Sequence, residues 1–254
     1  MGRAGDFDYE ANGPGYALRR RADPRIERLV HEALGSARSV VNVGAGAGSY
    51  EPETVAVTAV EPSATMRSQR PRGHGPAIEA VAEDLPFAEG SFDAAMAMVT
   101  VHQWYSPDRG LRELRRVSRG RIVILTFDGD ALGGFWLAQY APDLIEAERG
   151  RYPAIDRICA LLGGGAMVTS VPIPIDCTDG FTEAYYARPE LILERDLRAS
   201  QSAWGFVTPE AGEQAVDRLR KDLESGRWDR QFGHLRGQPT YEGSLRLIIT
   251  EKPG

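Results

Sequence analysis

Cysteine and histidine are scarce in this sequence. Among the 254 residues there are two cysteines, Cys159 and Cys177, and four histidines that lie far apart in the chain. Neither set has the spacing of zinc ligands or of a disulfide framework. We therefore expect neither a metal site nor structural disulfides.

Long apolar runs and an excess of basic residues are missing as well. No apolar run is long enough to span a bilayer, and the amino end lacks the charged-then-apolar order of a signal peptide. The net charge is −6 and the sequence pI is about 5.4, which argues against a surface that binds nucleic acid. We expect a cytoplasmic protein that acts on a small molecule and binds neither nucleic acid nor membrane. Its oligomeric state cannot be read from the sequence.

One stretch combines two apolar runs with a glycine-rich loop. Residues 40–43 read as a strand, glycines then alternate from Gly44 to Gly48, and a second apolar run over 55–60 ends in Glu61. Continuous apolar runs are typical of buried parallel strands, whose ligands bind at the carboxyl ends. Glycine lets the backbone turn sharply and approach a ligand, and an acid at the tip of the next strand can bind both hydroxyls of a ribose. The pattern predicts a nucleoside site.

The connection between these two strands is too short for the helix of a dinucleotide site. Ser49 stands where G-x-G-x-x-G has its third glycine, and only residues 49–54, interrupted by Pro52, precede the next strand. A diphosphate would lose the helix amino end that stabilises it, whereas S-adenosylmethionine carries no phosphate. The pattern favours S-adenosylmethionine, and a nucleotide-linked oxidoreductase is the less favoured alternative.

The remainder of the chain alternates short strands with helices. Asp23 and Pro24 predict the start of a helix that ends near Gly35, because aspartate is a good N-cap and proline suits the first helical position. Further predicted strands are 77–81, 93–99, 121–126, 167–175 and 244–250, and further predicted helices begin at Ser63, Pro107 and Pro209. This alternation predicts an α/β fold with a doubly wound, Rossmann-like, mostly parallel sheet.

We expect one domain over residues 1–254, with an antiparallel last strand and helical cap insertions. Two segments, 128–165 and 178–243, are longer than a minimal α/β connection and are expected to cover the ligand cleft. The expected parts are an irregular arm (1–22), the S-adenosylmethionine-binding core (23–127), the sixth strand with the cap segments (128–243) and the closing strand (244–254).

Four motifs together resemble the class I S-adenosylmethionine-dependent methyltransferases, in particular the bacterial methyltransferase type 11 group. They are Val-Asn-Val-Gly-Ala-Gly-Ala-Gly (41–48), Val-Glu-Pro-Ser (60–63), Ala-Glu-Asp-Leu-Pro-Phe-Ala-Glu-Gly-Ser-Phe-Asp (82–93) and Val-His-Gln-Trp (101–104). Their order and spacing cover about residues 7–127. A less specific resemblance continues in the tail, at 225–229, 233–236 and 243–247.

The resemblance implies a set of cofactor-binding residues. These are Gly44, Ala45 and Gly46 for the methionine and ribose, Glu61 for the ribose, Pro62 and Met66 for the faces of the adenine, and Ala82 and Glu83 for its edge. Two positions depart from the family pattern. Val81 stands where the family often has an aspartate, which leaves Glu83 or Asp84 for the adenine amino group, and the usual first crossover helix is missing.

The amino-terminal arm offers a second group of candidates. Tyr16 with Arg19 or Arg20 can close over the cofactor, the arginine pairing with its carboxylate. The alternative is that Tyr16 packs on the sheet and the arginines face water.

Methyl transfer from a sulfonium is a direct displacement, so that positioning and desolvation can supply most of the catalysis. A base is useful when the acceptor is a hydroxyl or a weakly acidic carbon. His102 is the candidate base, because it follows a strand at the carboxyl edge and an ordinary imidazole titrates at about pH 6.5. The alternative is that His102 is a wall of the substrate pocket. Asp128 is a weaker polar candidate.

Aromatic residues provide candidates for an acceptor pocket. They are Trp104, Tyr105, Phe135, Trp136, Tyr140, Tyr185, Tyr186 and Trp204, of which Trp104, Tyr105, Trp136 and Tyr140 are preferred. We expect about half of the set to be core. The sequence thus predicts a methyltransferase (EC 2.1.1.-) with a small apolar or aromatic acceptor. The alternative is an enzyme of the same fold that binds S-adenosylmethionine or S-adenosylhomocysteine for another reaction, such as a cyclisation.

Overall fold

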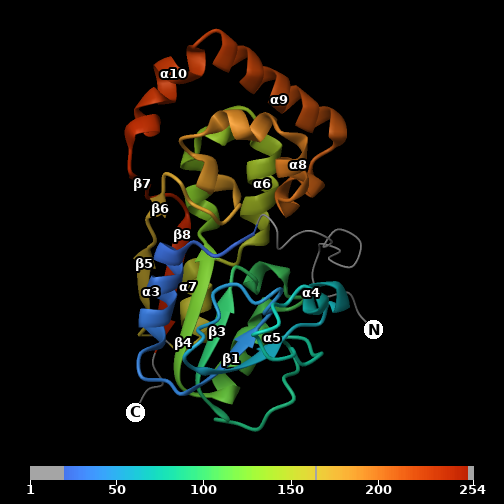
Figure 1. Cartoon of the computed structure of the whole chain (residues 1–254), viewed down its shortest axis with the longest axis vertical. Helices are drawn as coiled ribbons and strands as arrows, with labels where there is room; N and C mark the ends of the chain where they lie inside the picture. Colours follow the sequence, from blue (N-terminus) through green and yellow to red (C-terminus); the bar gives the residue numbers. More distant parts are fainter. Residues whose placement is uncertain (1–19, 164, 251–254) are drawn as a thin grey trace.

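The computed structural model describes residues 20–163 and 165–250, and its centre is a six-stranded sheet in the order β2-β1-β3-β4-β8-β5 (Figure 1). The strands are β1 (Ser39–Val43), β2 (Ala56–Val60), β3 (Phe92–Met98), β4 (Ser118–Phe127), β5 (Met167–Ser170) and β8 (Leu245–Thr250). The first four are parallel, and β8 is antiparallel to both of its neighbours, β4 and β5. This confirms the predicted doubly wound sheet with an antiparallel last strand.

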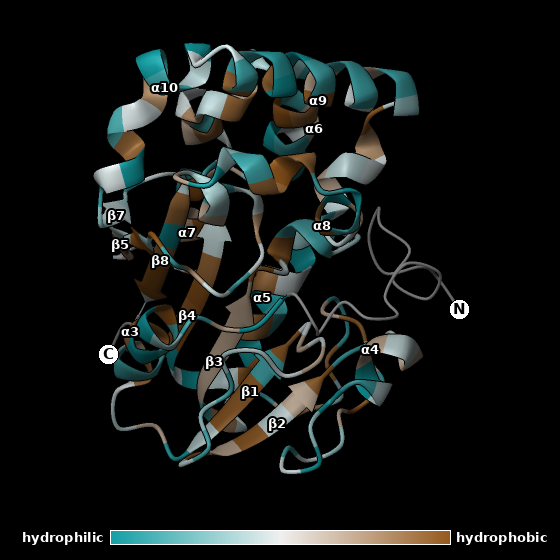
Figure 2. Cartoon of the chain, turned by 45° about the horizontal axis from the view of Figure 1, so that its top comes forward, coloured by the Kyte–Doolittle hydropathy of each residue, from teal (hydrophilic) through white to brown (hydrophobic). Residues whose placement is uncertain are grey.

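Helices cover both faces of the sheet. On one face α3 (Pro24–Leu34) packs against β4, and on the other lie α5 (Pro107–Val117) and α7 (Ile155–Leu161). The first helix begins as predicted, since the Asp23 carboxylate accepts a hydrogen bond of 3.0 Å from the backbone N–H of Arg25. Neighbouring strand residues point to opposite faces, and the central strands are apolar at consecutive positions, so both of their faces are apolar. Figure 2 shows the hydrophobic colour on these strands.

A helical cap lies over the carboxyl ends of β3 and β4 (Figure 1). Its helices are α6 (Pro142–Arg151), α8 (Arg195–Ala199), α9 (Pro209–Glu224) and α10 (Arg227–Phe232), and its 3₁₀ turns are η2 (Gly129–Gly134), η3 (Trp136–Gln139), η4 (Thr182–Tyr185), η5 (Pro189–Leu193), η6 (Ser202–Phe206) and η7 (Gly233–Gly237). The cap segments agree with the predicted insertions. None of the described helices is both long and apolar enough to cross a bilayer.

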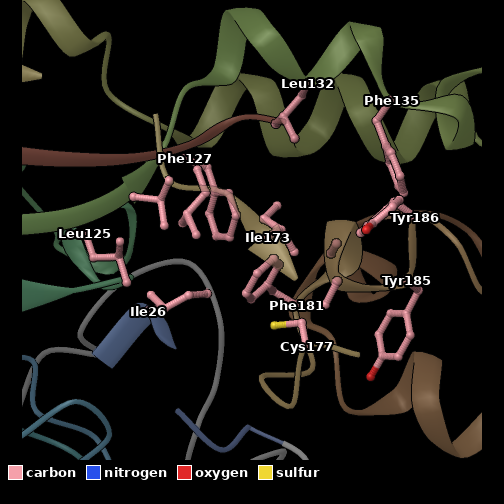
Figure 3. Close-up of a cluster of buried hydrophobic side chains, with 14 of the residues drawn as sticks. Ile26, Leu125, Phe127, Leu132, Phe135, Ile173, Cys177, Phe181, Tyr185 and Tyr186 are labelled. Atoms are coloured by element: carbon pink, nitrogen blue, oxygen red, sulfur yellow. The ribbon is translucent and has the colours of Figure 1, made fainter. Parts of the chain in front are cut away.

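Buried aromatic and aliphatic side chains join the cap to the sheet. Phe127, at the carboxyl end of β4, meets Phe181 with ring centroids 5.3 Å apart, and Leu132 and Cys177 belong to the same cluster (Figure 3). The cluster also contains Ile26 from α3. The position of the cap over the strand ends is therefore fixed by apolar packing.

Two predicted strands differ in the structure. In the segment predicted as a strand over 77–81, Ile78 makes only an isolated bridge to Val60, and at 38% exposure it has little packing to stabilise a longer ladder. The predicted strand 167–175 is broken into β5 and β6 (Ile173–Pro174), and β6 pairs with β7 (Thr240–Tyr241) in a separate sheet. Prolines at 172 and 174 explain the break, since proline has no N–H to donate to a ladder.

Candidate active site

The glycine loop after β1 folds back onto the end of β2. The backbone N–H groups of Gly44 and Ala45 donate to the carbonyl oxygen of Val60 at 2.9 and 3.0 Å. Gly44 has φ +71°, and a Cβ atom there would lie 2.1 Å from Oγ1 of Thr100, the second residue after β3. Only glycine suits this position, because the conformation is left-handed and the approach is close. As predicted, no helix follows the loop before β2.

Glu61 lies beside this loop and is 8% exposed. One carboxylate oxygen accepts a hydrogen bond from the N–H of Gly46 and the other from the N–H of Ser63, each at 2.8 Å. Burial raises the pKa of the carboxyl group above its ordinary value, and the two N–H donors oppose that shift. Each carboxylate oxygen has a further lone pair. The acid therefore holds the loop in place and can still accept hydrogen bonds from a ribose diol, so the residues fit S-adenosylmethionine.

A buried ion pair, not foreseen from the sequence, holds the short crossover that replaces the usual helix. The guanidinium of Arg70 donates to both oxygens of Glu51 at 3.0 and 2.7 Å, and the side-chain amide of Asn42 donates to the same carboxylate at 2.9 Å. The side chains of Arg70 and Glu51 are 5% and 4% exposed. Nothing in the local sequence signals this pairing, because Arg70 belongs to the following segment.

The predicted adenine residues separate into two groups. Met66 lies in α4 (Ala64–Ser68), which Ser63 caps, and its methyl carbon is 3.4 Å from where a Cβ of Gly46 would be. Pro62 precedes this cap and is partly buried. On the other side, Ala82 is buried, and a carboxylate oxygen of Glu83 accepts a hydrogen bond of 2.7 Å from the N–H of Ser106 at the start of α5. Their contacts with the adenine stay a prediction.

A small cavity of about 40 Å³ lies at the carboxyl ends of β3 and β4. Its polar walls include Arg20, His102, Glu148, Tyr152, Glu183 and Gln201, and its apolar walls include Val99, Phe127, Leu132 and Phe181. A second cavity, of about 220 Å³, is lined by Leu144 of α6, Trp204 of η6 and Gly212 of α9. Because α6 and η6 line both cavities, a shift of these two elements changes the space in each.

A strained turn links the glycine loop to the first cavity. Val99 has φ +51°, which is unfavourable for a β-branched residue and costs on the order of 1–3 kcal/mol. Its N–H donates to the carbonyl oxygen of Leu125 at 2.7 Å. Val99 and His102 line the cavity, and Thr100 between them contacts the loop at Gly44. A donor held by the loop is therefore close in the fold to the cavity.

His102 is buried on η1 (Val101–Gln103) and packs against Tyr152, with ring centroids 4.5 Å apart. Burial, and then the charges of Arg151 and Arg20, hold the imidazole pKa well below its ordinary value. The ring is therefore neutral at neutral pH. Its Nε2 lies 2.7 Å from the side-chain amide nitrogen of Gln103, and its Nδ1 has no hydrogen-bond partner within the described residues. The tautomer follows from the orientation of that amide, because the oxygen and nitrogen of Gln103 can exchange places.

Glu183 is a buried carboxyl group that the sequence analysis did not select. It is 1% exposed and accepts hydrogen bonds from the backbone N–H of Ser244 at 3.0 and 3.1 Å and from the Ser244 hydroxyl at 2.6 Å. Burial raises the pKa of Glu183 to about 7. Strongly shifted carboxyl groups in clefts are typical of functional sites.

Arg20 lies in the cavity wall and forms an ion pair with an acid of the protein itself. Its Nε donates to Asp179 at 2.6 Å, and the hydroxyl of Tyr50 donates to the other oxygen of Asp179 at 2.7 Å. The predicted pairing of Arg20 with the cofactor carboxylate stays a prediction. Tyr16 and Arg19 lie outside the described residues.

The four preferred aromatic residues do not line either cavity. Trp104 is packed against Gly110 of α5, and Tyr105 is 87% exposed. The indole of Trp136 donates to the carbonyl of Tyr186 at 3.0 Å, and Tyr140 donates to Asp222 at 3.0 Å. The cap needs a core of its own, and its buried aromatics form that core.

The remaining aromatic candidates and Asp128 lie in three different surroundings. Phe135, Tyr185 and Tyr186 are buried in the cluster between the sheet and the cap, whereas Trp204 lines the second cavity. Asp128 pairs with Arg246 at 3.2 Å. Assignment of any of these residues to an acceptor stays a prediction.

Comparison with known proteins identifies the class of domain. Residues 41–124 match the methyltransferase type 11 family model, described as a methyltransferase domain. This stretch, which contains the glycine loop, Glu61 and His102, is therefore a methyltransferase type 11 domain, and the chain is a homologue of class I S-adenosylmethionine-dependent methyltransferases. The resemblance seen in the sequence is confirmed, and membership of this family implies the use of S-adenosylmethionine.

Curated relatives match over part of their length. A chloroplastic 2-methyl-6-phytyl-1,4-hydroquinone methyltransferase of Spinacia oleracea is 29% identical over 117 residues, which are 41% of this chain and 33% of that protein. The demethylmenaquinone methyltransferase of Renibacterium salmoninarum is 34% identical over 122 residues, which are 44% of this chain and 51% of the relative. The matches thus span about a third to a half of these relatives.

A solved structure matches nearly the whole chain. It is a protein of Anabaena variabilis assigned as a methyltransferase of an antibiotic biosynthesis pathway. It is 28% identical, with a TM-score of 0.83, and the match covers 91% of this chain and 98% of that chain. The likeness includes the cap as well as the sheet, because it extends far beyond residues 41–124.

Proposed function

We propose that this protein is an S-adenosylmethionine-dependent methyltransferase (EC 2.1.1.-) that transfers the donor methyl group to a small-molecule acceptor by direct displacement. The observation that carries the proposal is the buried Glu61, whose two oxygens hold Gly46 and Ser63 beside a crossover without a helix. This arrangement suits a nucleoside with free ribose hydroxyls and no phosphate. The methyltransferase type 11 match of residues 41–124 supports the same reading.

The residues that would hold the donor are on the carboxyl side of β1 and β2. Glu61, which holds the loop at Gly46, would accept the ribose hydroxyls, the loop would adjoin the methionine portion, and Met66, which lies beside Gly46, would pack on the adenine. The bound donor supplies a methyl group that is already activated by its sulfonium. The chain has to orient the two reactants and exclude water, which can contribute up to roughly 7–11 kcal/mol.

We infer that the acceptor is a ring-bearing molecule with polar substituents. The cavity combines the apolar walls Phe127 and Phe181 with the polar walls His102 and Tyr152, and sites for small organic ligands have mixed walls of this kind. At about 40 Å³ it takes up a ring only after a shift of α6 and η6, which line it. Two relatives act, by their names, on a hydroquinone and on demethylmenaquinone. A quinone or hydroquinone ring is therefore the acceptor class to test first.

Calorimetric titration tests the donor site. S-adenosylmethionine and S-adenosylhomocysteine are expected to bind, and NAD is not. Glu61→Gln is expected to lower the affinity for both at least about tenfold, because each hydrogen bond to a charged group contributes roughly 1.5–3 kcal/mol. The matched control is Glu53→Gln, an exposed acid of the same crossover. Binding of NAD alone, or equal affinity in Glu61→Gln, contradicts the proposed site.

A labelled donor tests the transfer itself. The donor is labelled at its methyl group and incubated with 1,4-hydroquinones of increasing ring substitution, and the label is expected to appear in the acceptor. A label that stays in the donor while the added compound is converted favours the second hypothesis, in which the same fold catalyses a reaction such as a cyclisation.

A further inference from the structure

One carboxyl group in the wall of the first cavity lacks a cationic partner. The hydrogen bonds to Glu183 come from Ser244, at the start of β8. Within the described part of the chain, no arginine, lysine or histidine side chain lies within ion-pair distance of it. Glu148, the other carboxyl group in this wall, pairs with Arg151 and accepts a hydrogen bond of 3.0 Å from the Tyr152 hydroxyl. Glu148 therefore has a positively charged partner, whereas Glu183 has no ion-pair partner among the described residues.

The chain makes room for Glu183. A Cβ atom on Gly243 would lie 2.4 Å from a carboxylate oxygen of Glu183, so a side chain at 243 would push the acid from its position. The other titratable groups around it are Tyr241 and Arg246 near β8, and His102, Tyr152, Glu148 and Arg20 in the cavity wall. The charge of Arg246 lowers the pKa of Glu183, but Arg246 forms its ion pair with Asp128. A free cation is thus the missing partner.

A buried carboxylate without a cation is unfavourable, and burial accordingly holds the pKa of Glu183 at about 7. A positive charge that enters the cavity favours the ionised form. The sulfonium of S-adenosylmethionine is such a charge, and S-adenosylhomocysteine, which is a neutral thioether, lacks it. The cavity begins at Val99 and His102, on the strained turn whose Thr100 contacts the glycine loop. A donor bound at that loop therefore has its sulfonium charge on the side of the molecule where the cavity lies.

Building on the proposed function, we propose that Glu183 is the ionisable counter-charge of the methyl-transfer site, partly protonated in the free protein at neutral pH and deprotonated when the cationic donor binds. The carboxylate then serves in the transfer. When a hydroxyl acceptor attacks, its oxygen forms a bond to the methyl carbon, and the carbon–sulfur bond breaks with its electron pair on sulfur. The hydroxyl proton passes to Glu183, which regains it because the sulfonium charge is gone.

The experiment counts the protons released when each ligand binds. S-adenosylmethionine and S-adenosylhomocysteine are titrated into the protein at pH 6.5 in two buffers that differ in ionisation enthalpy, and the difference in heat gives the proton count. If the donor lowers the pKa of Glu183 from about 7 by about one unit, S-adenosylmethionine releases about 0.5 proton more than S-adenosylhomocysteine. The affinity for S-adenosylmethionine alone should rise about fivefold between pH 6 and pH 8.

Three variants separate Glu183 from its surroundings. In Glu183→Gln the difference between the two ligands is expected to vanish, whereas Glu183→Asp, which keeps a carboxyl group, is expected to retain most of it. Glu213→Gln is the control, because Glu213 is an exposed acid of α9 that lines neither cavity. That variant is expected to keep the full difference.

The outcomes distinguish this inference from the proposed function. Equal proton counts for the two ligands in the parent protein, or a difference that persists in Glu183→Gln, overturn the role of Glu183. Binding of both ligands in those cases leaves the proposed methyltransferase intact. Failure of both ligands to bind refutes the donor site and this inference with it. Equal proton counts in the parent protein overturn the inference even if Glu183→Gln does not fold, and Glu183→Asp then tests whether a measured difference belongs to this carboxyl group.

Discussion

The stability of the free protein should depend on pH through Glu183, and Glu183→Gln should remove that dependence. The variant is nearly isosteric, and its amide oxygen can still accept the hydrogen bond from the N–H of Ser244. Well below pH 4.5 the carboxyl group is neutral in both the folded and the unfolded chain, so its ionisation has no effect on stability there. As the pH rises, the unfolded chain ionises first, and the folded state is destabilised relative to it.

The size of this effect follows from the two pKa values. The folded value is raised from 4.5 to about 7, and one unit corresponds to about 1.4 kcal/mol, so the free energy of unfolding should fall by about 3 kcal/mol between pH 4.5 and pH 7.5. Above that range the loss is complete, because both states are ionised. For a chain of this length the change corresponds to roughly 6–12 °C in the melting temperature.

Thermal and urea unfolding of the parent and of Glu183→Gln, measured from pH 4.5 to pH 9, test this reasoning. The difference in the free energy of unfolding between the two proteins should change in favour of the variant across this range and become constant above about pH 8. Glu213→Gln, at an exposed position of α9, is the control and should track the parent. A difference that is independent of pH would show that Glu183 ionises in the folded protein as it does in the unfolded chain.

Two further predictions concern the glycine loop and the histidine. Gly44→Ala should abolish donor binding in calorimetry or prevent folding, because at φ +71° its Cβ would lie 2.1 Å from Oγ1 of Thr100. The control Gly73→Ala should bind the donor normally, because no atom lies within 4 Å of its Cβ. Normal donor binding by Gly44→Ala would refute the loop geometry. For His102, nitrogen-detected NMR should show a ring that is still neutral at a pH where an ordinary imidazole is protonated, because burial lowers its pKa, and a proton on Nε2 leaves Nδ1 able to act as a base. A proton on Nδ1 instead, with Gln103 donating to Nε2, would exclude the base role through that atom.

Local order in the sequence was enough to determine the helix and strands that carry the glycine loop. The helix capped by Asp23, the strand before Gly44 and the strand that ends at Glu61 all lie where the pattern predicts them. Each depends on neighbours within a few residues: a cap, a buried apolar run, a glycine that must turn. The two strands that were misjudged failed because 77–81 lacks cover and because proline interrupts 167–175.

Tertiary structure alone decided which residues lie over the carboxyl ends of the strands. Trp136 and Tyr140, predicted for a substrate pocket, lie in the interior of the cap, because a helical cap of this size must bury its own apolar surface; their contact with an acceptor stays a prediction. Glu183 carries no local signal, since its partner Ser244 is 61 residues away and reaches it through the closing strand. Periodicity and capping describe a segment and its neighbours, whereas the cavity is built where the cap lies over the strand ends.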